Sequence, residues 1–247
     1  MNIKIKIALL PALLLAIAGC SSTSSAVKSA TEYFKDGEQA YTEKNYEQAI
    51  ALWKKVKDSY ISPELTTKAE LNIADAMYNN GNFIEAAAEY ENFRKLHPNH
   101  EKAAYALYRL GMCNFQQITG IDTDQTSVSN AVHLFNSFLE TYPTSDLAKE
   151  VRQKLDEAVT VQLRHEIYVG RFYMRTGKYA AAIKRLEGAL AKFPGKAADD
   201  EALLYLGQSY LMSGDKAKGR EAFNRLATEY PASPFVGDAK KFMEKNY

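Results

Sequence analysis

The sequence predicts an all-α fold: a superhelical array of about five helical hairpins, closed by a C-terminal capping helix. Three observations lead to this prediction. No segment after Thr31 alternates apolar and polar residues as a half-buried strand would. Prolines in this part of the chain stand only where helical segments end. A pattern of small, large and proline residues also recurs five times, as expected of stacked repeats.

The repeated pattern starts with a small residue, has large or apolar residues four and seven positions later, and a proline twelve positions later. This spacing puts the first three side chains on one helical face, and the proline ends the helix. A fifth copy, Ala49-Trp53-Val56, has its proline two residues late, at Pro63. The four regular copies are Ala86-Tyr90-Phe93-Pro98, Ala131-Phe135-Phe138-Pro143, Ala182-Leu186-Ala189-Pro194 and Gly219-Phe223-Leu226-Pro231.

A preceding helix completes each hairpin. Four copies have another small residue twelve positions earlier, which would let the two helices approach closely: Gly37, Ala74, Gly170 and Gly207. The turns between the helices contain a residue that tolerates positive φ, and we expect it to end the first helix. These residues are Asn45, Gly81, Gly177 and Gly214. The five copies, over residues 31–233, resemble the tetratricopeptide repeat.

Two irregularities divide the array. In the third repeat Gly111 and Ala131 lie 20 residues apart instead of 12, so the turn around 119–126 is extended, and we expect Asp124 to cap the next helix. Residues 146–176 contain no proline and predict one helix of about 30 residues. This helix would join an N-terminal sub-array, 31–145, to a C-terminal one, 146–247. A last helix should run from Pro234 to about Asn246.

The first residues resemble a bacterial lipoprotein signal. Lys4 and Lys6 precede an apolar run, 7–18, that is shorter than the roughly 20 residues needed to cross a bilayer. The run ends in small residues before Cys20. The resemblance implies a signal peptide at 1–19, a Cys20 acylated with palmitate, anchoring in the outer membrane, and a flexible tether at 20–30. The alternative is an ordinary secretory signal with a chance cysteine.

Motifs for catalysis or cofactors are missing from the sequence. There is no glycine-rich phosphate loop, nucleophile elbow or recognisable Ser/His/Asp set. His97 and His100 could bind metal, but Pro98 breaks any helix there, so a solvated helix end is expected. Cys113 should be packed in the interior, and isolated His133 and His165 should be structural. With 31 basic against 30 acidic residues, nucleic acid binding is not indicated. We expect no enzyme, no cofactor and no metal.

The predicted concave side is rich in aromatic residues. It is formed by the first helix of each hairpin, where repeat arrays usually bind extended peptides. Aromatic side chains give large contact areas at low entropic cost, so this groove would suit extended apolar peptides. The alternative is that half of them fill the core between repeats. The residues predicted to line the groove are Phe34, Tyr41, Leu71, Tyr78, Tyr105, Tyr108 and Phe115.

Three segments, 96–100, 122–126 and 165–183, resemble the BamD family, the tetratricopeptide lipoproteins of the β-barrel assembly (BAM) machinery. The resemblance spans the chain in length, lipid signal, five repeats, extended third turn and long central helix. It implies a periplasmic adaptor that receives targeting segments of unfolded outer-membrane proteins and holds the periplasmic domains of BamA, with other Bam lipoproteins as possible partners. Arg185 matches the family's basic BamA contact, and we expect Arg171 and Arg175 in the same basic repeat to contribute.

Two other functions remain open from the sequence. The chain could be a different outer-membrane repeat lipoprotein, such as a pilotin for type IV pili or an adaptor in envelope division. It could also be a lipid-tethered enzyme without a recognisable motif, which ranks last because no polar catalytic cluster is visible.

Overall fold

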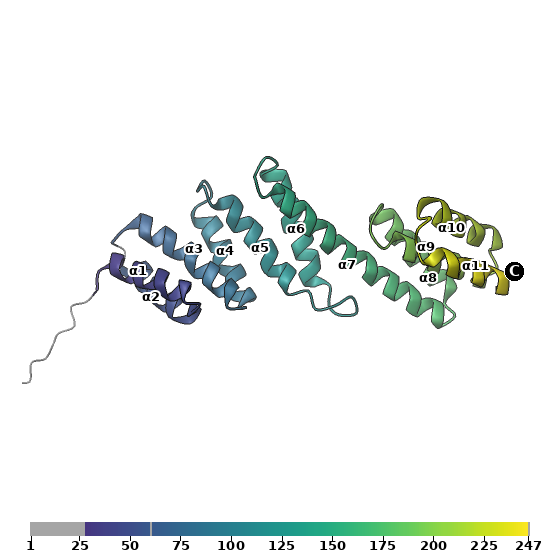
Figure 1. Ribbon diagram of the computed structural model, residues 1–247, viewed down its shortest axis with the longest axis horizontal. Helices are drawn as coiled ribbons and strands as arrows, with labels where there is room; N and C mark the ends of the chain where they lie inside the picture. Colours follow the sequence, from purple (N-terminus) through teal and green to yellow (C-terminus); the bar gives the residue numbers. More distant parts are fainter. Residues whose placement is uncertain (1–27, 60, 247) are drawn as a thin grey trace, which may run out of the picture.

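The computed structural model describes residues 28–59 and 61–246. In this part of the chain all regular structure is α-helical, and Figure 1 shows the helices stacked side by side in an elongated array. This confirms the predicted fold class. The helices are α1 (Ala30–Thr42), α2 (Tyr46–Ser59), α3 (Pro63–Asn79), α4 (Phe83–Leu96), α5 (Ala103–Gln116), α6 (Thr126–Thr141), α7 (Ala148–Arg175), α8 (Tyr179–Lys192), α9 (Asp199–Met212), α10 (Lys216–Glu229) and α11 (Phe235–Asn246).

Each helix packs mainly against the helices next to it in sequence, so that α1 to α10 form five consecutive hairpins. The predicted final helix is confirmed as α11, which packs on α9 and α10. Each apolar core cluster is therefore built from neighbouring elements, as expected for a solenoid.

Glycines set the distance between the two helices in four of the five hairpins. A Cβ atom added at any of them would lie 2.5–2.8 Å from the facing side chain, which is closer than real Cβ contacts come. The predicted role of small residues in the first helix is therefore confirmed for Gly37, Gly170 and Gly207, and Gly111 has the same role in the third hairpin. The pairs are Gly37 with Trp53, Gly111 with Phe135, Gly170 with Leu186 and Gly207 with Phe223.

Proline ends the second helix of four hairpins, as predicted. The residue before each proline caps the helix with φ between −131° and −127° and ψ between 55° and 58°. Proline disfavours the helical conformation for its predecessor, which explains why all four caps leave the helix in the same way. The cap residues are His97, Tyr142, Phe193 and Tyr230.

The turns inside the hairpins confirm three predicted glycines and correct one asparagine. Gly81, Gly177 and Gly214 all have positive φ. In the first hairpin the prediction of Asn45 is wrong, because Lys44 has the positive φ, 61°. Asn45 instead lies at the start of α2, where its Oδ1 accepts the Gln48 amide at 3.4 Å. An asparagine side chain can accept a backbone amide at the start of a helix, and Asn45 has this role here, so the positive φ falls to the residue before it.

The N-terminal hairpin begins slightly earlier than predicted. The Ser29 hydroxyl accepts the Glu32 amide at 3.3 Å, while the Glu32 carboxylate accepts the Ser29 amide at 2.7 Å. This reciprocal capping box starts α1 at Ala30, within the last residues of the predicted tether. The predicted signal peptide, 1–19, and lipidated Cys20 lie outside the described residues.

The long helix α7 has 28 residues, close to the predicted 30. Its first part packs with the third hairpin, where Ala148 and Val151 join a cluster containing Phe135. Its second part forms the fourth hairpin with α8, which it contacts through Leu163 and Ile167. One helix thus belongs to both proposed sub-arrays.

Candidate protein-interaction surfaces

Asp75 of α3 connects three helices of the N-terminal repeats. Its Oδ1 accepts the hydroxyl of Tyr90 on α4 and, at 2.8 Å, that of Tyr105 on α5. Arg109 of α5 donates from Nε to the Tyr90 hydroxyl at 3.0 Å and lies 3.7 Å from Asp75. Burial raises the pKa of both tyrosine hydroxyls, so they stay protonated and can donate to the carboxylate.

Three half-buried tyrosines, Tyr41, Tyr78 and Tyr105, surround this centre, one from each of the first three repeats. We call them the tyrosine surface. The Arg109 guanidinium lies 3.7 Å above the ring of Tyr78, and the Tyr41 hydroxyl accepts a hydrogen bond from Asn79. A hollow of about 270 Å³ adjoins Tyr41 and is lined by Glu38, Tyr41, Thr42, Trp53, Asn72 and Asp75. The surface therefore combines aromatic rings with an acidic hollow.

The other predicted groove residues are packed more deeply. Leu71 and Tyr108 belong to the core, with 9% and 7% of their surface exposed. The Tyr108 hydroxyl donates to Glu150 of α7 at 2.6 Å, which joins repeat three to the long helix. Phe34 and Phe115 are half-buried, with ring centres 6.4 Å from Trp53 and 6.3 Å from Phe135. The prediction that all seven line a groove is therefore wrong for Leu71 and Tyr108.

Arg185 of α8 lies in a second hollow, and its Nε forms an ion pair with Glu166 of α7. We call this hollow of about 410 Å³ the Arg185 pocket. It has three cationic side chains and one carboxylate, so a positive charge remains after the ion pair forms. Its lining residues are Glu166, Tyr173, Ala181, Lys184, Arg185, Gly188, Ala189, Lys192 and Phe193.

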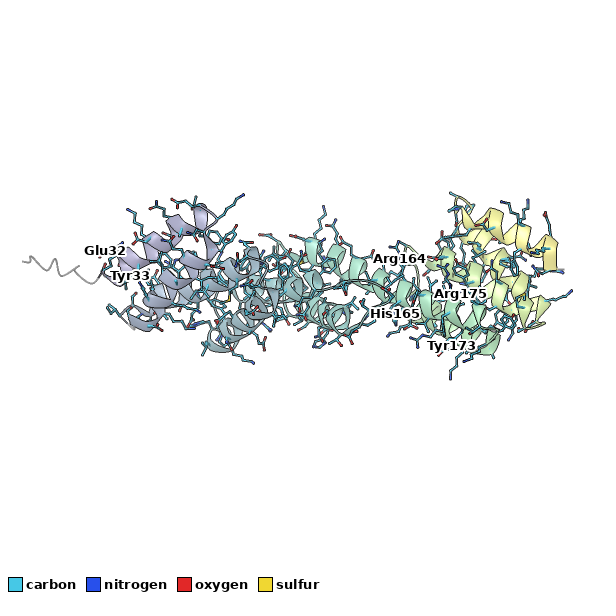
Figure 2. The ribbon with its side chains drawn as sticks, turned by 90° about the horizontal axis from the view of Figure 1, so that it is seen from below. Glu32, Tyr33, Arg164, His165, Tyr173 and Arg175 are labelled. Carbon is cyan, nitrogen blue, oxygen red and sulfur yellow. The ribbon has the colours of Figure 1, made fainter. Side chains whose placement is uncertain are left out.

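Arg171 and Arg175 do not join the Arg185 pocket. Arg171 lies 3.6 Å from Glu201 of α9, with its guanidinium 4.7 Å from the centre of the Tyr205 ring. Successive helical residues are rotated by about 100°, which puts both arginines nearly half a turn from the pocket residue Tyr173. In Figure 2 Tyr173 lies on the opposite edge of α7 from Arg164, which shares the face of Arg175. The three arginines predicted to act together thus lie on two surfaces.

Two histidines have structural partners that sequence reasoning missed. His97 is not merely solvated, because its Nε2 lies 2.7 Å from Oε2 of the buried Glu70. His165 of α7 bonds through Nδ1 to the Ile121 carbonyl of the extended turn at 2.6 Å. Both partners are distant in sequence, so no local pattern could have identified them.

Three observations concern metal ligands, the one described cysteine and helix length in residues 28–59 and 61–246. No group of three or more metal-binding side chains occurs within residues 28–59 and 61–246. Cys113 is fully buried, and burial raises the pKa of its thiol to about 12, which keeps it in the unreactive protonated form. In the same part of the chain no helix is both long and apolar enough to cross a membrane.

These features define a helical-repeat scaffold of the tetratricopeptide type, with surfaces suited to protein partners. The family model YfiO, described as an outer membrane lipoprotein, matches residues 26–223. The chain belongs to this family, and its resemblance to BamD is confirmed.

Three relatives are each named outer membrane protein assembly factor BamD. The protein of Neisseria meningitidis serogroup A is 25% identical over 252 residues, covering 95% of this chain and 94% of the relative. That of Rickettsia prowazekii is 26% identical over 236 residues, covering 94% of each. That of Caulobacter vibrioides is 25% identical over 202 residues, covering 82% of this chain and 66%, just under two thirds, of the relative.

Solved structures of repeat proteins are also similar. The TPR2AB domain of yeast Sti1, in a complex titled with pHSP90, is 12% identical with a TM-score of 0.47, covering 87% of this chain and 84% of that one. YrrB, titled a TPR protein with an unusual peptide-binding site, is 15% identical with a TM-score of 0.39, and the match covers 86% of this chain and 92% of that one.

Proposed function

We propose that the protein is a lipid-anchored adaptor of the outer-membrane β-barrel assembly machinery. The observation that carries the proposal is the family match over residues 26–223, together with relatives named as assembly factors over nearly the whole chain. In this proposal Cys20 holds the chain by its lipid to the periplasmic face of the outer membrane. The repeats act by binding proteins, without catalysis, a cofactor or nucleic acid.

The Arg185 pocket is the proposed docking site for the periplasmic domains of BamA. Its excess of positive charge favours an acidic surface on the partner, and its apolar floor at Ala189 and Phe193 offers contact area. Arg185 is held in place by Glu166, so less side-chain entropy is lost on binding. An acidic group of BamA would share the Arg185 guanidinium with Glu166.

The tyrosine surface is the proposed site for targeting segments of unfolded outer-membrane proteins. Tyrosines present rigid, amphipathic contact area, which suits an extended peptide with alternating aromatic side chains. The Asp75 contacts hold Tyr105 in place before any peptide arrives. The adjoining acidic hollow would favour a peptide with a cationic group at that position.

A pull-down of the tagged, full-length lipoprotein in mild detergent, followed by mass spectrometry, tests the proposed function. Recovery of BamA with its periplasmic domains, with or without other Bam lipoproteins, is the expected result. Recovery of a secretin or of division proteins without BamA would overturn the function but leave the fold unchanged.

Arg185→Glu should weaken binding of purified BamA periplasmic domains by roughly 30-fold or more, since loss of an interfacial charge partner typically costs about 2 kcal/mol or more. Isothermal titration calorimetry would measure the change. Arg225→Glu on α10 is the matched control, because Arg225 is also ion-paired and is 48% exposed against 41% for Arg185.

A charge swap separates binding from folding. Combining Glu166→Arg with Arg185→Glu restores the internal ion pair with reversed polarity. If the swapped protein is as stable as the parent yet still binds BamA poorly, Arg185 acts at the interface. Full recovery of binding would show that the ion pair has only a structural role.

A further inference from the structure

One face of α7 carries exposed arginines and aromatic rings that the proposed function does not use. Counted from the first of its five residues, the other four follow after four, seven, eight and eleven positions, which places them along one side of a helix. We call it the α7 arginine face, and Figure 2 shows two of its members, Arg164 and Arg175. The face consists of Arg164, Tyr168, Arg171, Phe172 and Arg175.

The aromatic residues of this face are unusually open to solvent. Tyr168 and Phe172 are 42% and 48% exposed. Among the exposed large hydrophobic side chains of residues 28–59 and 61–246, they are the only two that lie one helical turn apart on the same helix. Single exposed apolar side chains need no explanation, but a contiguous pair between arginines has the composition of a protein interface.

The charges of this face are only partly balanced. Arg171 is paired with Glu201. Arg164 and Arg175 form no ion pair or hydrogen bond with any described residue and are exposed. The acidic centre at Asp75 lies on α3, in another part of the array. The unpaired charges therefore leave α7 with a local positive potential that would attract an anionic partner.

We propose that the α7 arginine face binds an extended polypeptide segment in which acidic residues alternate with aromatic or aliphatic ones. Carboxylates would pair with Arg164 and Arg175, and apolar side chains would pack on Tyr168 and Phe172. From residue 164 to 175 the helix rises about 16 Å, which an extended chain of about five residues can span. The arginines of this face lie nearly half a turn of α7 away from the pocket residue Tyr173. The two surfaces adjoin only at Phe172, whose ring centre is 5.9 Å from that of Tyr173.

The direct test uses the full-length lipoprotein in mild detergent and two fluorescein-labelled peptides. One peptide alternates Glu with Phe, and the other has Lys in place of each Glu. Fluorescence anisotropy should show binding of the Glu peptide only, with an affinity that falls as NaCl rises from about 50 to about 500 mM. Equal binding of both peptides, or no binding of the Glu peptide, would overturn the proposal.

Paired variants locate the site. Arg164→Glu with Arg175→Glu should weaken binding of the Glu peptide at least tenfold, whereas Lys240→Glu with Lys241→Glu on α11 makes the same change in net charge and should have less than a twofold effect. Tyr168→Ala with Phe172→Ala should also weaken binding. Ile84→Ala with Leu96→Ala, which removes two exposed apolar side chains of α4, is its control.

Two outcomes would overturn the assignment of the site. Equal loss of affinity in the α11 variant would mean that only net charge matters. Loss of affinity in Arg185→Glu, but not in Arg164→Glu with Arg175→Glu, would place the peptide in the Arg185 pocket. Because Arg164 and Arg175 have no partner among the described residues, their substitution should leave the thermal unfolding midpoint unchanged, and circular dichroism would verify this.

Discussion

At the scale of single residues, the fit between glycine and a facing ring decides how closely two helices approach. Gly207→Ala would put a methyl carbon 2.5 Å from Cε1 of Phe223, a ring that is itself buried. We expect this variant to lose about 1–3 kcal/mol of unfolding free energy through overpacking. Chemical denaturation of the purified protein would measure the loss.

Gly188 provides the matched control, because it lies inside α8 with nothing within 4 Å of an added Cβ. Gly188→Ala should stabilise the protein by about 0.5–1 kcal/mol, since alanine favours the helix. If both variants were equally neutral, the close approach of α9 and α10 would not depend on glycine.

Residue-level prediction from the sequence succeeded where one side chain meets another at fixed spacing. In the four hairpins with a regular turn, the small residue of the first helix and the large residue of the second lie 16 positions apart, as Gly207 and Phe223 do. Prediction failed where a side chain contacts a residue that is distant in sequence and not in the same hairpin. Tyr108 was predicted in the groove, but its hydroxyl meets Glu150, 42 residues later.

At the scale of elements, the extended third turn is fastened to the long helix. The Ile121 carbonyl bonds to His165, and the Asp124 carboxylate accepts the Thr126 amide at 2.8 Å, as predicted. The N-cap position itself belongs to Gln125 and not, as predicted, to Asp124. His165→Ala should cost about 1 kcal/mol, the usual net value of such a bond. It should also speed hydrogen exchange in residues 117–125, measured by mass spectrometry.

His133→Ala is the control for this measurement, since His133 is exposed on α6. Its exchange rates in the turn should equal those of the parent protein. Unchanged rates in His165→Ala as well would mean that the turn holds its conformation without α7.

The lengths and ends of elements were largely predictable, because proline stops and missing helix breakers act locally. The proline stops and the 28-residue helix α7 agree with the sequence analysis. Which neighbouring helix each face of α7 and α8 contacts was less predictable from the sequence. Arg185 and Arg171 both belong to a basic repeat, yet one meets Glu166 and the other Glu201, because the neighbouring helices lie on different sides of α7.

At the scale of the whole molecule, α11 closes an array that would otherwise expose its last core cluster. Ala239 is buried on α9 and α10, and Phe242 lies 6.5 Å from Phe223 between ring centres. Ending the chain at Pro234 should therefore cost about 2–4 kcal/mol, as loss of buried apolar side chains does. The urea midpoint would measure this change.

The location of the damage is the sharper test of this truncation. Amide protection should fall in α9 and α10 and persist in α1 and α2, because repeats contact only their neighbours. A uniform loss over all described helices would instead mean that the array unfolds as one unit.

The packing of each helix on its sequence neighbours also bears on how the chain acquires its structure. Contacts between residues close in sequence give a low contact order, which favours rapid folding. The hairpin of α1 and α2 needs only α3 to cover its apolar side. The N-terminal repeats can therefore become structured while the C-terminal ones are still unfolded, and each further helix finds its docking site already in place.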